Sequence, residues 1–411
     1  MKSLGKKVKI SIDAKIGVLL LLLTSIFSID QILIIECALL LLCIVRRKII
    51  IRPIFILLLI VLSIHGCINT ILGNNEFRLF VNQLFGISVS FVYFDSICDG
   101  EDKFALFQFY LQVAIVIALL VIAQQLGYIL HIQKLYDLNW IFKRQLFTTT
   151  DDGMLRASSF FTEPAACAIA MAPGMYVSIH TLLRRETTFY NYYEAIILLL
   201  GYVLTYSSVG YISIGIALIL FAAEYRINYK AWLAIGLMIL AVVAIYIKVP
   251  AFKMRVDDTV NIVQDNNIED ENLSSVTIVA NQKVAAKTFF SSKGLGTGIG
   301  SYRLDYDKYI SQVVNTFSLR LKLNREDANS LFLRTLAELG VFGILGIAFF
   351  LLKFRVSETF TPEKVVSNAL LLYMLTRLFR SGHYFHNNLY FFVSLYIGIY
   401  FLSKQKRKEM P

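Results

Sequence analysis

The segment Arg156-Ala-Ser-Ser-Phe-Phe-Thr-Glu163-Pro164 places a guanidinium and a carboxylate directly before a long apolar run. Proline is favoured at the first position of a helix, so we expect a helix to begin at Pro164. The free N–H groups and the dipole of a helix start attract anions, and Arg156 adds a planar donor suited to phosphate. Glu163 could orient this arginine or accept a proton. The pattern predicts an anion site; the simpler alternative is a capping glutamate and an arginine that anchors the chain at lipid headgroups.

A second cationic group ends another apolar run, where Arg377, Arg380 and His383 recur at intervals of three. Helical spacing predicts that they share one face. A central membrane arginine costs roughly 2.5–3.5 kcal/mol on insertion scales, so two on one face favour a cavity that holds an anion. The alternative for Arg380 is that its side chain extends to the membrane surface.

The stretch Gly294-Leu-Gly-Thr-Gly-Ile-Gly-Ser-Tyr-Arg303 has glycine at every second position. A dinucleotide fingerprint would need a preceding strand in a βαβ unit, which the sequence does not offer. We expect a tight loop with positive φ that lets backbone approach a ligand, with Arg303 directed at the same site; a plain turn is the alternative. Asp305 and Asp307 have the spacing of a metal-binding pair, but no nucleotide is expected outside the cell, and we predict no metal and no cofactor.

A further charged group surrounds the start of a late apolar run. Asp327 and Asn329 lie just before it, and Arg334 and Glu338 lie within it, four residues apart and therefore on one face. A structural ion pair is the common explanation of such spacing, although charges within membrane segments often mark functional interiors.

These residues are carried by a chain that is 57% apolar and 17% charged, whereas soluble domains have about 25% charged residues. Apolar runs long enough for a bilayer recur throughout, and we predict an all-α polytopic bundle of about twelve spans, a single membrane domain over residues 1–411. The expected spans are about 16–29, 32–45, 53–72, 78–95, 104–130, 164–183, 192–207, 209–223, 231–249, 329–352, 365–381 and 388–403. The first is interpreted as a retained helix rather than a cleaved signal.

The net charge of +11 comes mainly from lysine and arginine in short loops and at the two ends of the chain. This is the positive-inside pattern, so it predicts cytoplasmic termini and gives no indication of nucleic-acid binding. The acidic loop 95–103 argues against this assignment. We keep the assignment because the rule counts lysine and arginine and ignores Asp and Glu. Two long segments, 131–163 and 250–328, are then outside, and the second is expected to be partly helical near 273–290.

The Arg156–Pro164 segment resembles the R-x-x-G-x-F-x-E-P stretch of Wzy-type O-antigen and capsule polymerases, with Ser159 in place of the usual glycine. Leu204–Gly210, the Gly294–Gly300 loop and Asn329–Gly340 are similar to segments of the same family. Related O-antigen ligases have His-Asn where this chain has Ala328-Asn329, so that histidine is missing here.

The resemblance implies a GT-C-type membrane glycosyltransferase in the bacterial inner membrane, multi-pass, with its active site facing the periplasm. It implies transfer of a glycan from undecaprenyl pyrophosphate to the next lipid-linked repeat unit without a metal. Its partners would be these lipid-linked glycans, the bilayer, and a chain-length regulator and a flippase of the same pathway. Arg156, Arg303, Asn329, Arg334, Arg377 and Arg380 would bind pyrophosphate or glycan, and Glu163, Asp327 or His383, in that order, would serve as the base.

Three other functions fit parts of the pattern. An O-antigen ligase-like transferase would share the motifs apart from the missing histidine. A lipid-linked oligosaccharide flippase would need internal repeats and a site at the membrane midplane, and the sequence shows no repeats. In a purely structural scaffold the arginines would be dispensable.

Overall fold

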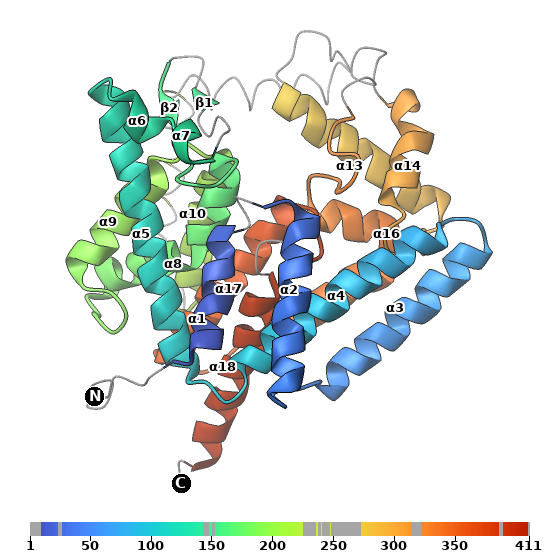
Figure 1. Cartoon of the computed structure of the whole chain (residues 1–411), viewed down its shortest axis with the longest axis horizontal. Helices are drawn as coiled ribbons and strands as arrows, with labels where there is room; N and C mark the ends of the chain where they lie inside the picture. Colours follow the sequence, from blue (N-terminus) through green and yellow to red (C-terminus); the bar gives the residue numbers. More distant parts are fainter. Residues whose placement is uncertain are drawn as a thin grey trace.

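The computed structural model describes residues 10–23, 27–142, 148–149, 153–224, 273–313, 322–385 and 389–409, and the single positions 236, 240 and 247. Its helices follow the expected spans wherever both can be compared (Figure 1); the span 231–249 lies almost wholly outside the described residues. The helices are α1 Ile12–Leu23, α2 Ile29–Val45, α3 Pro53–Ile71, α4 Phe77–Cys98, α5 Lys103–Ile129, α6 Gln133–Tyr136, α7 Asn139–Phe142, α8 Pro164–Arg184, α9 Tyr192–Val203, α10 Ser208–Glu224, α13 Leu273–Ser291, α14 Tyr302–Tyr309, α16 Leu331–Lys353, α17 Pro362–Phe379 and α18 Leu389–Glu409.

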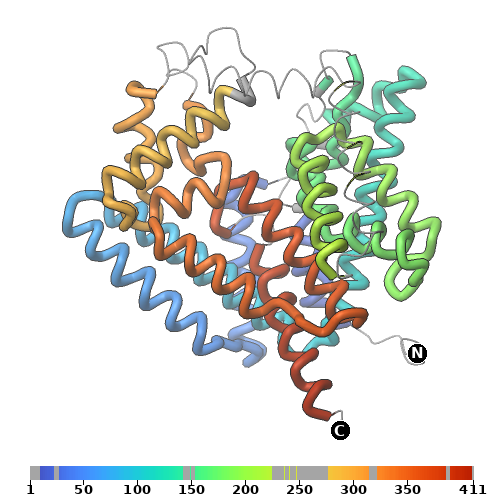
Figure 2. Tube along the Cα trace, turned by 180° about the vertical axis from the view of Figure 1, so that it is seen from behind, coloured from blue at the N-terminus to red at the C-terminus, as the bar shows by residue number. Residues whose placement is uncertain are grey.

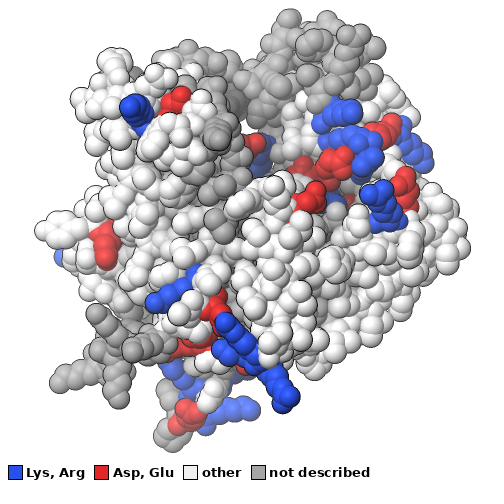
Figure 3. All heavy atoms as spheres, in the orientation of Figure 1, with Lys and Arg blue, Asp and Glu red and all other residues white. Residues whose placement is uncertain are grey.

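The all-α polytopic membrane fold is confirmed. Within the described residues five helices, α3, α4, α5, α8 and α16, are long and apolar enough to cross a membrane, and α9 and α10 are shorter apolar helices. In Figure 3 the charged side chains gather at two ends of the molecule, with a broad uncharged surface between them. Large apolar side chains such as Leu57 and Val61 on α3 and Phe342 on α16 are more than half exposed. Such a surface suits lipid rather than water.

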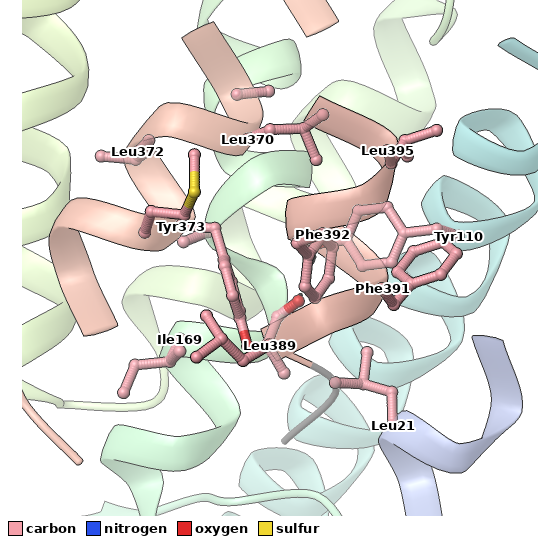
Figure 4. Close-up of a cluster of buried hydrophobic side chains, with 14 of the residues drawn as sticks. Leu21, Tyr110, Ile169, Leu370, Leu372, Tyr373, Leu389, Phe391, Phe392 and Leu395 are labelled. Carbon is pink, nitrogen blue, oxygen red and sulfur yellow. Dashed lines mark hydrogen bonds between the residues drawn. The ribbon is translucent and has the colours of Figure 1, made fainter. Parts of the chain in front are cut away.

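The interior is formed by α8 and α17, which pack against α5, α9, α10 and α18. The apolar part of α8 is 83% buried, so this helix is surrounded by protein rather than lipid. Aromatic rings fill the space between helices: Phe392 of α18 lies 3.9 Å from Tyr373 of α17 and 5.1 Å from Tyr110 of α5, centroid to centroid (Figure 4). A rigid centre of this kind can hold polar loops at its ends in fixed positions.

Some boundaries differ from those expected. The first helix covers residues 12–23 rather than 16–29, because Ser28 forms a capping box with Gln31 and begins α2 there. The apolar run 192–223 is divided by Leu204–Ser207 into α9 and α10, as predicted. The segment 131–163 is not a bare loop: it holds α6, α7 and a hairpin in which β1, Thr148–Thr149, pairs antiparallel with β2, Leu155–Arg156.

The two termini lie at the same end of the bundle, and α13, α14 and the β1–β2 hairpin lie at the opposite end (Figures 1 and 2). We call these the inner end and the outer end. The acidic 95–103 loop lies at the inner end against the basic connection before α3, where Arg52 contacts Asp95 at 2.8 Å and Asp99 at 3.7 Å. Its carboxylates therefore neutralise a neighbouring arginine within the protein, which explains an acidic loop on the otherwise basic side.

Candidate functional site

The segment that precedes α8 is held in place by two glutamines of α5. Gln125 donates from Nε2 to the carbonyls of Leu155 and Leu204, at 2.7 and 2.8 Å. Gln124 accepts from the Ser159 N–H at 2.7 Å and donates to the Ser159 carbonyl at 3.2 Å. A glutamine in an apolar span is ordinarily explained by core hydrogen bonding, and the sequence alone does not show that these two bind the segment before α8.

Ser159 has a φ of 54° and is fully buried. Glycine adopts positive φ without steric cost, whereas serine does so with strain. The glycine of the family motif at this position is therefore explained by backbone conformation rather than by chemistry. The departure at Ser159 leaves the shape of the segment intact, because both backbone groups of Ser159 bond to one side chain.

Pro164 begins α8, as predicted, and Glu163 occupies the position before it. The Glu163 carboxylate makes no capping hydrogen bond; its side chain is 61% exposed and lies 3.7 Å from the guanidinium of Arg380. The simple capping alternative is therefore not what the structure shows. Arg156 lies in β2, half-buried, with its charge near the hydroxyl of Tyr211 at the start of α10.

The predicted helical face of Arg377, Arg380 and His383 is wrong. Helix α17 ends at Phe379, Arg380 has extended backbone (φ −138°, ψ 145°) and Ser381 has a φ of 75°. Arg377 is fully buried and donates to the Ser381 hydroxyl at 2.7 Å and to the His383 carbonyl at 2.8 Å. The chain thus folds back over the helix end, and the arginine fixes the turn that carries the histidine; His386 and Asn387 lie outside the described residues.

This turn presses His383 against the segment before α16. The His383 Nε2 lies 3.5 Å from the Asp327 Oδ2, and the Gly382 N–H donates to the same carboxylate at 3.3 Å. The Asp327 Oδ1 accepts from the Asn329 N–H at 3.1 Å, and the Asn329 carbonyl accepts from the Ser381 N–H at 3.0 Å. Two segments about 55 residues apart in sequence therefore form one histidine–aspartate pair.

The charge states of this pair follow from its surroundings. Burial acts to raise the pKa of Asp327, but His383 in its protonated form, hydrogen bonds from Asn324 and Asn329 and the charge of Arg334 outweigh it and hold the pKa below its usual value. Burial, helped by the charges of Arg334 and Arg377, lowers the pKa of His383 to about 4, although Asp327 opposes the shift. At neutral pH the carboxylate is ionised and the imidazole is neutral, which is the state in which an imidazole accepts a proton.

Arg334 and Glu338 form a buried ion pair at 2.9 Å, as their spacing predicted. Arg334 also donates to the Gly382 carbonyl at 3.2 Å, and its guanidinium lies 4.7 Å from the centre of the Tyr384 ring. All of these contacts are with the protein itself. Arg334 therefore joins α16 to the turn that carries the histidine.

The glycine loop encloses the Glu338 carboxylate rather than an open site. Its four glycines, Gly294, Gly296, Gly298 and Gly300, all have positive φ, as predicted. The N–H groups of Gly300 and Tyr302 donate to the carboxylate of Glu338 at 2.8 and 3.2 Å. The loop thereby fixes the first half of α16, and Arg303, 45% exposed, faces outward with Glu326 at 3.8 Å.

The two aspartates with metal-like spacing point to different partners. Asp305 is buried and accepts from the hydroxyls of Thr297 and Ser301, at 2.6 and 3.3 Å; burial raises its pKa to about 7. Asp307 pairs with Arg325 at the surface. Among the residues that the structure describes, no three His, Cys, Asp or Glu side chains come together as a metal site.

Gly382 is a site residue that the sequence analysis missed. A Cβ at this position would lie 1.5 Å from the Asp327 carbonyl oxygen, so only glycine allows the two segments to touch. Its signal is present in the sequence, where a glycine stands directly before His383 just past an apolar helix. A glycine there is easily taken for an ordinary helix terminator.

The family model for O-antigen ligase matches residues 195–348 of this chain, somewhat more than a third of its length. The match begins in α9, includes the glycine loop, Asp327 and Arg334, and ends within α16. It confirms the resemblance over this part and supports an O-antigen ligase or polymerase-like membrane glycosyltransferase. The chain has no significant match among curated proteins or among solved structures.

Proposed function

Because this family match and the outer-end histidine–aspartate pair occur in one polytopic chain, we propose that the protein is a glycan polymerase. It would join repeat units carried on undecaprenyl pyrophosphate at the periplasmic face of the bacterial inner membrane, with both termini in the cytoplasm. The observation that carries the proposal is the contact of His383 with Asp327 beside the partly exposed Arg380.

In the proposed reaction an acceptor sugar hydroxyl attacks the anomeric carbon of the donor glycan. The bond from that carbon to the pyrophosphate oxygen breaks, a new glycosidic bond forms, and the electron pair leaves on undecaprenyl pyrophosphate. His383 accepts the hydroxyl proton, and Asp327 orients the imidazole and stabilises its charge. Neutral His383 suits this role better than Glu163, whose carboxylate is exposed and paired with an arginine.

The leaving pyrophosphate needs cations at the place where its charge develops. Arg380, whose side chain is 22% exposed, and Arg156 in the preceding hairpin are the arginines that we assign to it, with Glu163 orienting Arg380. Arg334 and Arg377 donate hydrogen bonds to the turn and act as positioning residues. Asn329 holds that turn through its backbone, and Arg303 faces outward, where a glycan would extend.

The missing ligase histidine supports a polymerase, with a ligase as the second candidate because the matching model carries that description. Ala328 is buried, and it follows the aspartate that His383 contacts. We infer that an imidazole reaches this place from the segment after α17 instead of from the segment before α16. An imidazole that comes from a different segment is consistent with an acceptor different from that of the ligases.

The polymerase, ligase and flippase functions are separated by the glycans of a deletion strain of the source bacterium, complemented with the wild-type chain or an empty vector. Loss of a polymerase leaves single repeat units on the final acceptor, whereas loss of a ligase leaves long polymer on the carrier lipid. Loss of a flippase leaves single repeat units on the cytoplasmic face of the membrane, out of reach of an external glycosidase. Unchanged glycans in the deletion strain would reject all three functions.

A further inference from the structure

We infer that the inner end carries a binding site for the headgroup of phosphatidylethanolamine, separate from the outer-end site. A cavity of about 350 Å³ opens there between the start of α1, the α2–α3 connection and the α4–α5 connection. Sites for small molecules begin at about 300 Å³, so the cavity has room for a phosphate and a short amine. Polar and charged groups line it: Ser11, Asp13, Arg47, Lys48, Ser96, Asp99 and Glu101.

One lining carboxylate, Asp13 of α1, is held by Arg46 at 2.6 Å, and the other charges lie on two connections. Arg47 and Lys48 come from the α2–α3 connection, and Asp99 and Glu101 come from the α4–α5 connection. Within the described residues Arg47 has no ion pair, and its side chain is exposed. A ligand with a phosphate at one end and an ammonium at the other would contact both walls.

The contacts that these charges make within the protein are loose. Lys48 lies 3.7 Å from Asp13, and Asp99 lies 3.7 Å from Arg52. The Ser11 N–H reaches Glu101 at 3.3 Å. Direct hydrogen bonds of this type are usually 2.7–3.2 Å long, so these groups retain capacity for a ligand.

An apolar rim next to the cavity indicates a lipid rather than a soluble metabolite. Val45 is 80% exposed at the end of α2, and Ile49 and Ile51 are 37% and 49% exposed on the same connection as Arg47. In a membrane-spanning protein such side chains meet acyl chains. The site therefore offers charge to a headgroup and an apolar surface to its tails within a few residues.

The charge pattern selects among phospholipids. Phosphatidylglycerol has a phosphate but no ammonium, so it would leave Asp99 and Glu101 facing an anion. Phosphatidylcholine has an ammonium that cannot donate hydrogen bonds, and quaternary ammonium is normally held by aromatic rings, which the cavity lining does not contain. Phosphatidylethanolamine supplies a phosphate for the arginine and three N–H donors for the carboxylates.

The test uses the purified full-length chain in nanodiscs of dioleoyl phosphatidylcholine, with a small fraction of one test lipid. Lipid retained by the protein is counted by native mass spectrometry, and thermal melting checks folding. We expect retention in the order ethanolamine, glycerol, choline. Arg47→Ala and Asp99→Asn should each lower the affinity for phosphatidylethanolamine about tenfold, the ratio that one charge-assisted hydrogen bond supports.

Lys408→Ala is the matched control, because Lys408 is an exposed cation at the same end, on the last turns of α18. It should leave the preference unchanged, and free phosphoethanolamine should not compete at the same concentration. Equal retention of choline and ethanolamine lipids, or equal loss in Lys408→Ala, would reduce the effect to general bilayer contact. Retention of phosphatidylglycerol above phosphatidylethanolamine would overturn the assignment of the acidic wall.

Discussion

His383→Asn removes the proposed base while keeping a small polar side chain that tolerates an irregular backbone. General base catalysis contributes about 10²–10⁴ in rate, so we expect the turnover number to fall by that factor. The KM for the lipid-linked donor should change little, because the arginines proposed to bind pyrophosphate are untouched. The assay is extension of purified lipid-linked repeat units in nanodiscs, followed on gels.

The pH profile of the wild-type enzyme gives a sharper result, because the structure lowers the pKa of His383 to about 4 from 6.5. A histidine works as a base only when neutral, so activity holds as the pH falls until that lowered pKa is reached. At about pH 5.5 an ordinary histidine is mostly protonated, whereas His383 stays largely neutral because its pKa is lowered. We therefore expect nearly full activity at this pH.

Asp327→Asn tests separately the two proposed roles of Asp327, which are to orient the His383 imidazole and to stabilise its charge. The carboxylate opposes the lowering of the His383 pKa, so its removal should move the acid limb to still lower pH while the rate falls. His131→Asn is the matched control, because His131 is exposed and lies at the outer end, between α5 and α6. An acid limb near pH 6.5, or His383→Asn with more than a third of wild-type turnover, would refute the reasoning.

Three further predictions concern the scaffold and the hairpin. Gly382→Ala should abolish extension, since its Cβ would overlap backbone at 1.5 Å, whereas Gly346→Ala, where the Cβ meets nothing within 4 Å, should be silent in the same gel assay. Glu338→Ala should destabilise by about 3–5 kcal/mol, because it leaves a buried arginine charge, and Arg334→Met combined with Glu338→Leu should recover most of that in denaturant melts. Arg156→Lys should reduce extension as strongly as Arg156→Ala at equal protein level, because lysine lacks the planar fork; wild-type activity of the lysine variant would leave Arg156 a simple anchor.

Periodicity and composition were sufficient to predict where the helices lie. Apolar runs of about 20 residues, short basic loops and Pro164 as a helix start depend on local physics, and the structure shows helices at those places. The pairing of Arg334 with Glu338 was also predictable, because four residues bring two side chains together on any helix.

Contacts between distant segments were not predictable in this way. The spacing of three residues predicted that His383 lies on a helix. The turn at Ser381 and the close approach of Gly382 to Asp327 are long-range features that this spacing does not show. The partner of Glu163 likewise comes from a segment more than 200 residues away. A single sequence shows the residue types of such a site but does not show which of them pair.

We expect the interruption in α16 to make the protein sensitive to bilayer thickness. Gly340 has φ 60° and ψ −146°, and Val341 donates its N–H to the Gly294 carbonyl at 2.9 Å, so the helix is broken where the glycine loop crosses it. The half beyond the break, Val341–Lys353, rises only about 20 Å, against a hydrocarbon core of about 30 Å. A thicker membrane would draw the polar contact between the glycine loop and α16 toward the acyl chains. The same contact holds the Glu338 carboxylate that supports Arg334. We therefore expect acyl chain length to strain the outer-end turn, without any headgroup binding to that turn.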